Sequence, residues 1–352
     1  MRVDLTRQQV LLHRIHQHEL DRRISDAAEL AVFSLGVQDN TSGSALLSLA
    51  ARLAEPKVDD FVVTWSVRGA PHLHRAGELK AFSRALWPWS DADARARAAR
   101  PKVDDLLDAL RHIATAMRSI VTKPMTKGEV SKALTPLAPK QTIEPCRGCE
   151  TEHVSDPIFR LGALPAGLRI IPEEKTVTFE RIHGWPGVPR KTAGFDELVH
   201  RYLTLHGPAG PSEVASYFGS STREVKKRWP KDGLTEVTVD GQKAWLPEDL
   251  EIADAEPPAV RLLPPTDPYL QARDRDLLLP DKAAQKDIFR ILGRRGAILV
   301  DGEIAGSWQG RVVSGKRFEV TATPYRPLPD LLPETQLLAQ AKGLDDASVK
   351  SN

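Results

Sequence analysis

The sequence contains little cysteine, few aromatic residues and no long apolar run. Of its 352 residues two are cysteine and 6% are aromatic. A disulfide framework is therefore excluded, and the close spacing of Cys146 and Cys149 fits a reducing compartment. No segment approaches the roughly 18 consecutive apolar residues that a membrane-spanning helix requires. The N-terminal segment MRVDLTRQQVLLHRI also scatters charges among its apolar positions, unlike a signal peptide. We therefore expect a cytoplasmic protein with no membrane partner.

Motifs of nucleotide-dependent and redox enzymes are missing as well. The sequence shows no glycine-rich phosphate loop, no dinucleotide fingerprint and no Ser-His-Asp order. Nucleotide hydrolysis and redox chemistry are therefore poor interpretations, and we expect no nucleotide cofactor and no other cofactor. Apolar residues at 41% and charged residues at 27% fit a globular chain of several domains.

The N-terminal part of the chain predicts short helices followed by a β-ribbon. Apolar spacing favours a helix over residues 5–23 that begins at Thr6, and a second helix that starts near Ser25 and Asp26 and stops at Gly36. A third helix follows, and Phe61–Val67 then reads as a strand that turns at residues 69–71. This order is typical of a winged helix.

The same order returns twice. In residues 103–143, Thr126 and Glu129 have the spacing of a capping box at the start of a helix. In residues 195–253, three helices precede a hairpin whose Asp240-Gly241 is a strong turn signal. Asp301-Gly302 predicts another hairpin further on.

These patterns predict an α+β fold of three tandem winged-helix units followed by a small β-rich C-terminal domain. The predicted ranges are 1–102 for the first unit, 103–192 for the second with its CxxC-containing insertion, 193–256 for the third, 257–335 for the β-rich domain, and 336–352 for a disordered tail.

The stretch SLGVQDNTSGSA places Gln38, Asp39 and Asn40 between two predicted helices. Asp and Asn are good helix caps, so the cluster has a purely structural interpretation. Carboxylates and amides can also direct a water molecule or stabilise a developing positive charge. Either role fits the residue types.

Several segments taken together resemble the bacterial winged-helix DNA glycosylases of the AlkZ and YcaQ type. They are WSVRGAPHLH, RYLTLHGPAGPSEVASYFG, LLPPTDPYLQARDR and ILVDGEIAGSWQGR, and the likeness runs from about residue 5 to 325. Members of this family unhook bulky alkyl adducts and interstrand crosslinks from DNA. The family's catalytic signature is a Gln, one apolar residue, and then Gln or Asp. Gln38 and Asn40 align with its two catalytic positions, while Asp39 stands where an apolar residue is usual, so the carboxylate is displaced by one residue.

The resemblance implies a DNA-repair hydrolase that is a monomer, binds double-stranded DNA near the nucleoid and needs no metal. We expect a monofunctional DNA glycosylase that hydrolyses the N-glycosidic bonds of bulky alkylated purines or crosslinks, with Gln38, Asp39 and Asn40 as catalytic residues. The alternative is a non-catalytic winged-helix DNA-binding protein, either a regulator or a resistance protein that shields alkylation damage. The polar trio at residues 38–40 discriminates the two, because a binder has no use for it.

Basic clusters supply candidate DNA contacts, although a solvated helix face or a hairpin edge gives the same pattern. Lys and Arg near phosphates provide affinity without sequence choice. The candidates are Arg68, His72 and His74 at the first ribbon, Arg223, Lys226, Lys227 and Arg228 on a predicted helix, and Arg311, Lys316 and Arg317 in the β-rich domain.

Cys146, Cys149 and His153 offer three zinc ligands in the segment CRGCETEH. A structural zinc site needs four ligands, usually from two such pairs, and the sequence has no second pair. His183 or a carboxylate could be the fourth ligand. Two free thiols explain the pattern equally simply, and we expect no metal.

Overall fold

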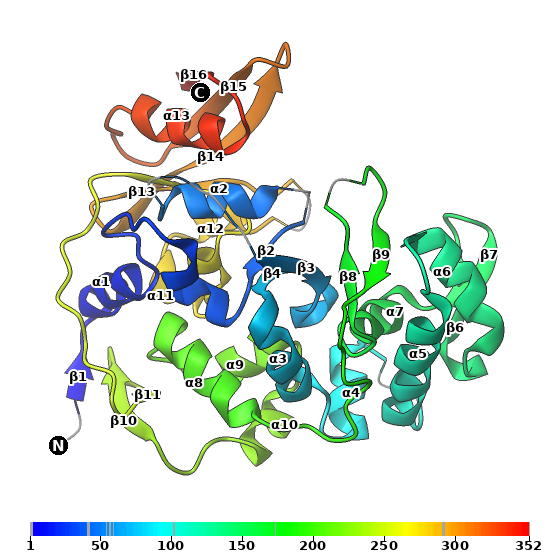
Figure 1. The fold of residues 1–352 in the computed structure, drawn as a ribbon. Helices are drawn as coiled ribbons and strands as arrows, with labels where there is room; N and C mark the ends of the chain where they lie inside the picture. Colours follow the sequence, from blue (N-terminus) through cyan, green and yellow to red (C-terminus); the bar gives the residue numbers. More distant parts are fainter. Residues whose placement is uncertain are drawn as a thin grey trace. The chain divides into compact units, whose positions relative to one another are not determined.

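The computed structural model describes residues 3–40, 43–53, 55, 58, 60–100, 103–172, 174–290 and 293–351. Figure 1 shows its helices and strands. The chain divides into two units built from non-consecutive segments. The first comprises Met1–Asp59, His200–Glu213 and Pro230–Asn352, and the second comprises Asp60–Val199 and Val214–Trp229. The fold is mixed α+β with several sheets, as the sequence predicts. The division into winged-helix units stays a prediction.

The first unit begins with strand β1 (Val3–Leu5) and helix α1 (Arg7–Gln17). The capping box of Thr6 and Gln9 starts α1, so the predicted cap is confirmed. β1 runs parallel to β10 (Leu234–Val239), which pairs with β11 (Gln242–Pro247) across the predicted Asp240-Gly241 turn. Both turn residues have positive φ, 47° and 79°, as this hairpin turn requires.

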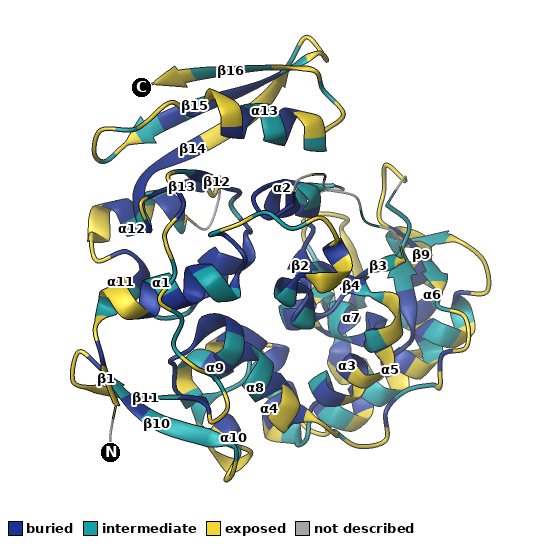
Figure 2. Cartoon of the chain, turned by 60° about the vertical axis from the view of Figure 1, so that its left-hand side comes forward, coloured by how far each residue is buried: buried dark blue, intermediate teal, exposed yellow. Residues whose placement is uncertain are grey.

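A second sheet of the first unit has the order β12, β13, β14, β15, β16. Asp301-Gly302 joins β13 to β14 as predicted. The first half of β14 is buried and its second half is exposed (Figure 2), because only the first half packs against the core. The five strands are β12 (Arg261–Leu263), β13 (Gly296–Val300), β14 (Glu303–Val313), β15 (Arg317–Pro324) and β16 (Asp346–Ser351).

Short helices complete the first unit, and one buried and one partly buried ion pair hold its segments together. Arg52 and Asp267 are fully buried and form two hydrogen bonds of 2.8 Å, and Arg14 pairs with Asp274. The helices are α2 (Ser44–Ala50), α11 (Arg275–Leu278), α12 (Lys282–Ile288) and α13 (Leu332–Ala341), with short 3-10 turns at Ala27–Glu29, Ala31–Ser34 and Pro268–Gln271.

Two sequence predictions are wrong here. Residues 28–35 form two 3-10 turns instead of one α-helix, because Leu30 is extended (φ −65°, ψ 121°) and interrupts the helix. The tail predicted to be disordered forms α13 and β16. β16 pairs in parallel with β15, and Leu338 and Ala339 are buried, so packing orders a segment whose composition alone looked frayed.

The second unit is built on an antiparallel sheet in which β4, β3, β8, β9 and β5 are neighbours in that order. Trp65 of β3 lies at its core and packs edge-to-face on Phe159 and Phe179, with ring centroids 5.9 and 5.0 Å away. The strands are β3 (Phe61–Trp65), β4 (Pro71–Arg75), β5 (Met125–Thr126), β8 (Leu168–Ile170) and β9 (Thr178–Arg181).

The helices of the second unit pack around this core. The Thr126–Glu129 capping box starts α6 as predicted. α5 packs on α6 and α7, and α6 contacts a separate hairpin of β6 (Ile143–Cys146) and β7 (Thr151–Val154), as Figure 1 shows in green. The helices are α3 (Leu79–Leu86), α4 (Asp91–Arg97), α5 (Leu106–Ile120), α6 (Lys127–Leu134), α7 (Asp156–Ala163) and α10 (Thr222–Lys227). Two further helices, α8 (Phe195–His206) and α9 (Pro211–Phe218), each have residues in both units.

Across the described part of the chain, no helix combines the length and the apolarity that crossing a bilayer requires.

Candidate active site and DNA-contacting residues

The segment that carries Gln38, Asp39 and Asn40 is an extended connection between a 3-10 turn and helix α2. Gly36 precedes it with φ 85°, a left-handed conformation that glycine adopts without strain. Gln38 lies in the short strand β2 (Val37–Gln38). Gln38 and Asp39 are buried, at 7% and 8% exposure, whereas Asn40 is exposed. Thr41 and Ser42 of the same polar stretch lie outside the described residues.

Asp39 is tied to the N-terminus of α2. Its Oδ1 accepts hydrogen bonds from the backbone N–H of Ala45 at 2.9 Å and from the Ser44 hydroxyl at 3.1 Å. The first N–H groups of a helix have no partner within the helix, and a carboxylate there also interacts favourably with the helix dipole. The capping interpretation is therefore confirmed for Asp39. Ser44 and Ala45 were not predicted as partners of Asp39, and the serine at the helix start is the only signal of them in the sequence.

The side chains of Gln38 and Asn40 form a hydrogen bond with each other. The Gln38 Nε2 donates to Asn40 Oδ1 at 2.8 Å, which fixes the orientation of the Gln38 amide. The Gln38 Oε1 is buried and has no hydrogen-bond partner among the described residues. An unpaired buried carbonyl is costly unless a water or a ligand satisfies it. The amide therefore presents a strong, oriented acceptor.

Arg68, His72 and His74 do not form the exposed polar edge that the sequence suggested. β4 is covered on both faces, so His72, Leu73 and His74 are all buried. His72 Nδ1 donates to the Ala70 carbonyl at 2.9 Å, and His74 Nε2 lies 2.8 Å from the Ser66 hydroxyl. Burial lowers the pKa of His72 to about 3, and burial followed by the neighbouring His72 lowers that of His74. Both rings are neutral at pH 7, so we do not propose them as phosphate contacts.

Arg68 adopts a left-handed backbone conformation (φ 55°) at the turn between β3 and β4. Its guanidinium donates to the Tyr217 carbonyl and lies 5.3 Å from the centre of the Tyr217 ring. These contacts anchor the turn to α9 within the second unit. These contacts account for the position of the Arg68 side chain, and its DNA contact stays a prediction.

The four basic residues of the α10 region are exposed as a group. Arg223, Lys226, Lys227 and Arg228 are all exposed, and Lys227 also pairs with Glu224. Glu224 is buried and accepts hydrogen bonds from Trp89 and Ser90, at 3.2 and 2.8 Å, which fixes the helix on the second unit. This cluster has the exposure and the charge that phosphate contact requires.

The basic residues of β14 and β15 are less available. Arg311 donates to the buried carboxylate of Glu319 at 2.6 and 2.8 Å, and Arg317 lies 3.8 Å from Asp346. Lys316 is exposed at the turn between the two strands. Cross-strand pairing therefore offsets part of the positive charge that the sequence predicted here.

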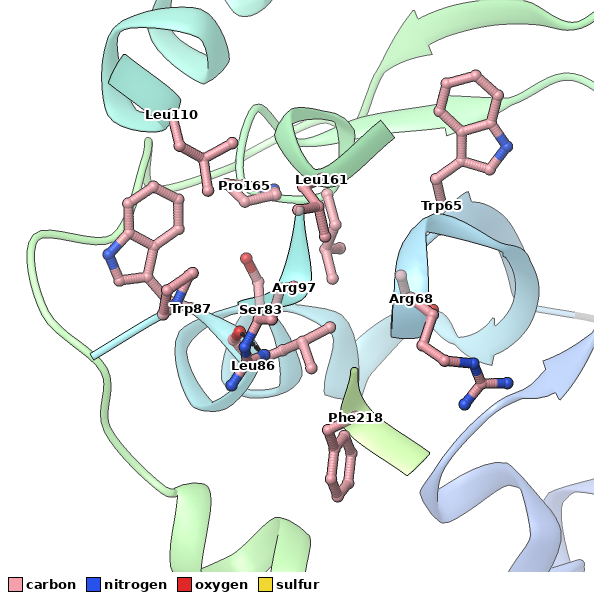
Figure 3. A pocket seen from close by; sticks show the side chains of 13 residues that line it. Trp65, Arg68, Ser83, Leu86, Trp87, Arg97, Leu110, Leu161, Pro165 and Phe218 are labelled. Carbon is pink, nitrogen blue, oxygen red and sulfur yellow. Dashed lines mark hydrogen bonds between the residues drawn. The ribbon is translucent and has the colours of Figure 1, made fainter. Parts of the chain in front are cut away.

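One small cavity lies inside the second unit, with a volume of about 20 Å³. Figure 3 shows indole, aliphatic and phenyl groups around it, and the Arg68 guanidinium pointing away. Such a volume has room for about one water molecule, so this cavity is no slot for an extruded base. Its lining includes Trp65, Trp87, Leu110, Leu161, Pro165 and Phe218.

The structure also brings Cys146, Cys149 and His153 together at the tip of the β6–β7 hairpin. Their potential ligand atoms all lie within 4.8 Å of one another. His183, which the sequence offered as a fourth ligand, is not in this group.

The described residues thus include a buried, oriented amide at Gln38 and a group of exposed basic side chains at α10. Residues 33–347 match the family model described as DNA glycosylase AlkZ-like, and the chain belongs to the AlkZ-like DNA glycosylase family.

The fold agrees with this assignment. The solved structure of the Streptomyces sahachiroi DNA glycosylase AlkZ resembles the chain with a TM-score of 0.75 and 20% sequence identity. The match covers 99% of this chain and 100% of that one. No curated protein matches the chain. The resemblance drawn from the sequence is thus confirmed.

Proposed function

We propose that the protein is a monofunctional DNA glycosylase that hydrolyses the N-glycosidic bonds of bulky or cationic alkylated purines, or of crosslinks, in duplex DNA. Membership of the AlkZ-like family supports a DNA substrate and a glycosylase role. The observation that carries the proposal is the Gln38 Oε1, which is buried, oriented by Asn40 and without a partner among the described residues.

The chemistry suits such a group. As the base departs, the sugar becomes oxocarbenium-like, and a water molecule must be directed at the anomeric carbon. An alkylated purine already carries positive charge, so its departure needs little help from a general acid. The enzyme must therefore hold the water and stabilise positive charge on the sugar, and a neutral amide oxygen with its dipole fixed can do both.

The three residues of the segment then have different roles. Gln38 accepts a hydrogen bond from the attacking water through Oε1. Asn40 orients Gln38 and adds a second polar group at the exposed side. Asp39 anchors the segment, because its Oδ1 accepts hydrogen bonds from Ser44 and Ala45 at the start of α2. This favours an amide over a displaced carboxylate as the water-directing group.

Binding is proposed to rest on exposed basic residues, first among them Arg223, Lys226 and Arg228 around α10. We propose that winged-helix units present this helix to the phosphate backbone, as a recognition helix is presented in related folds. The protein acts as a monomer in the cytoplasm.

A duplex containing 7-alkylguanine tests the proposal. Wild-type protein should produce abasic sites, and Gln38→Ala should lower the single-turnover rate by roughly 100-fold, the scale of a lost water-directing group. Gln242→Ala, at an exposed hairpin position, is the matched control and should leave the rate unchanged. Absence of cleavage by the wild type would contradict the glycosylase proposal, and full activity of Gln38→Ala would remove Gln38 from the chemistry.

A specific observation favours a second candidate, a non-catalytic protein that shields damaged DNA. The carboxylate of Asp39 is engaged in helix capping, and Asn40 stands where the family signature has Gln or Asp. A shield would bind alkylated duplex more tightly than undamaged duplex and produce no abasic sites. Binding that barely changes with salt concentration would contradict both candidates.

A further inference from the structure

The tip of the β6–β7 hairpin lacks the packing that normally holds such an element. Residues 147–152 are all exposed, and the two strands form a sheet of their own. The base of the hairpin is held by its contact with α6 and by the buried Val154. The exposed tip has a defined turn, in which Glu150 adopts a left-handed φ of 53°. The hydrophobic core therefore holds the base of the hairpin and not its tip.

The turn at the hairpin tip holds the Cys146 sulfur in place. The sulfur receives hydrogen bonds from the backbone N–H groups of Gly148 and Cys149, two and three residues further on, and from the Cys149 thiol. These contacts fix the position of the Cys146 sulfur beside Cys149. Cysteine sulfur is a ligand that zinc prefers.

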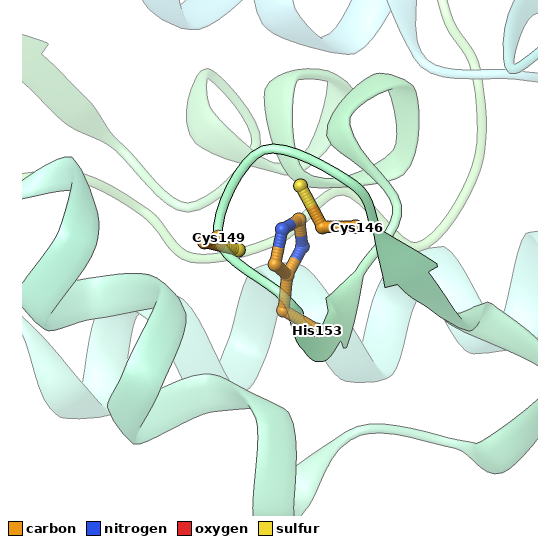
Figure 4. A group of neighbouring side chains, drawn as sticks. All are labelled: Cys146, Cys149 and His153. Atoms are coloured by element: carbon orange, nitrogen blue, oxygen red, sulfur yellow. The ribbon is translucent and has the colours of Figure 1, made fainter.

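His153 is set up as a nitrogen ligand. Its Nδ1 lies 2.8 Å from the Val154 carbonyl, which can only accept, so Nδ1 carries the proton. The Nε2 lone pair is then free. In most metal-binding histidines, the ring nitrogen that does not bind the metal donates a hydrogen bond of this kind, which fixes the tautomer and the ring orientation. Figure 4 shows the imidazole between the two cysteine side chains.

We propose that Cys146, Cys149 and His153 bind one Zn²⁺ ion, with water or an external donor as the fourth ligand. Two sulfurs and one imidazole nitrogen are the donor set that zinc prefers. The ligand atoms lie within 4.8 Å of one another, so small rotations of the side chains bring them to a common ion. The ion neutralises the two thiolates and links the residues of the hairpin tip to one another. The proposal replaces our expectation of a metal-free protein and does not depend on glycosylase activity.

The fourth coordination position of the proposed zinc site has no protein ligand among the residues described, whereas a structural zinc site has four. No other cysteine, histidine or carboxylate of the described chain joins the group. Glu144, which is the cross-strand neighbour of His153, is engaged by Arg100. An open position fits zinc bound by three protein ligands and a solvent molecule.

The test uses the full chain kept reduced, stripped with a chelator, reloaded with Zn²⁺ and separated from free metal. Mass spectrometry of the metal content should give one zinc per chain. Co²⁺ in place of Zn²⁺ should show thiolate-to-cobalt charge transfer and the absorption of a tetrahedral site. Cys149→Ser and His153→Ala should each weaken zinc binding by more than the about 10- to 100-fold that loss of an outer hydrogen bond costs.

Two matched variants serve as controls. Arg147→Ala changes the same exposed tip without removing a ligand, and His183→Ala removes an exposed histidine outside the group. Both should bind zinc like the wild type. Cys149→His keeps a ligand and should retain zinc even if Cys149→Ser folds poorly. Stoichiometric zinc in Cys149→Ser, no zinc in the reduced wild type, or a Cys146–Cys149 disulfide that persists under reductant would overturn the proposal.

Discussion

The Asp39 Oδ1 accepts a hydrogen bond from the backbone N–H of Ala45 at 2.9 Å, so the carboxylate that follows Gln38 is a cap of helix α2. Substitutions of Asp39 can distinguish an effect on stability from an effect on catalysis, because asparagine can accept the same hydrogen bond and alanine cannot. We expect Asp39→Asn to retain both stability and glycosylase activity. Asp39→Ala should lose about 0.5–2 kcal/mol of stability, the usual range for a lost cap.

Denaturant unfolding and abasic-site formation measure the two effects. If Asp39 is instead the base that activates water, Asp39→Asn will be as inactive as Asp39→Ala while remaining as stable as the wild type. That pattern would move the chemistry from the amide to the carboxylate.

The Gln38 amide is expected to act on the rate and not on DNA affinity. Its Oε1 is buried and its Nε2 bonds Asn40, so it offers little to a phosphate backbone. Gln38→Ala should lower the single-turnover rate and leave the Kd for alkylated duplex within about twofold, well below one tenfold step of 1.4 kcal/mol. A matched loss of affinity would indicate that the residue only shapes the binding surface.

The exposed basic residues of α10 are expected to contact phosphates. Arg223→Ala and Lys226→Ala should each weaken DNA binding and reduce the slope of log affinity against log salt by about one unit. Lys282→Ala is the control, since Lys282 is exposed but already pairs with Asp276. Arg311→Ala should have a smaller effect than either, because Glu319 offsets its charge. Equal effects for all four would indicate a non-specific charge response.

Acid should destabilise the fold through its buried histidines. The pKa of His72 falls from 6.5 to about 3 on burial. Between these values the unfolded chain binds a proton that the folded chain does not, so stability is complete above pH 6.5 and falls as the pH drops below it. His72 alone accounts for about 2 kcal/mol at pH 5.

The pKa of His18 is also lowered, by burial and then by His206, and adds in the same direction. Urea unfolding between pH 7.5 and 5 at intervals of about half a pH unit measures the slope. His183→Ala, which removes an exposed histidine, should leave that slope unchanged, and a flat profile in the wild type would mean that the histidines are protonated when folded.

The Arg52–Asp267 pair is expected to be the most sensitive ion pair in the first unit. Both side chains are fully buried, and Asp267 also accepts from the Tyr269 N–H at 2.9 Å. Asp267→Asn leaves the guanidinium buried without its counter-charge, which costs about 3–5 kcal/mol. Asp276→Asn, which removes an exposed partner of Lys282, should hardly move the unfolding midpoint. A similar shift for both would contradict the role of burial.

The sequence by itself determined the local features. Caps at Thr6 and Thr126 and the turns at Asp240-Gly241 and Asp301-Gly302 follow from interactions within a few residues, and the structure has all four. The order of motifs was enough to indicate the family. Caps and tight turns can be predicted from the sequence because the residues that form them are close together in the chain.

Tertiary structure decided what depends on distant partners. The sequence offered His72 and His74 as DNA contacts or as a polar hairpin edge, but β4 is covered on both faces and burial keeps the two rings neutral. The C-terminal residues 336–352, whose composition predicted disorder, include the end of α13 and all of β16, because β16 pairs with the edge of β15. At Gln38–Asn40 the sequence left capping and chemistry open. The fold assigned the cap to Asp39 and left the Gln38 oxygen as the free acceptor, since only the folded chain shows which polar atoms are already paired.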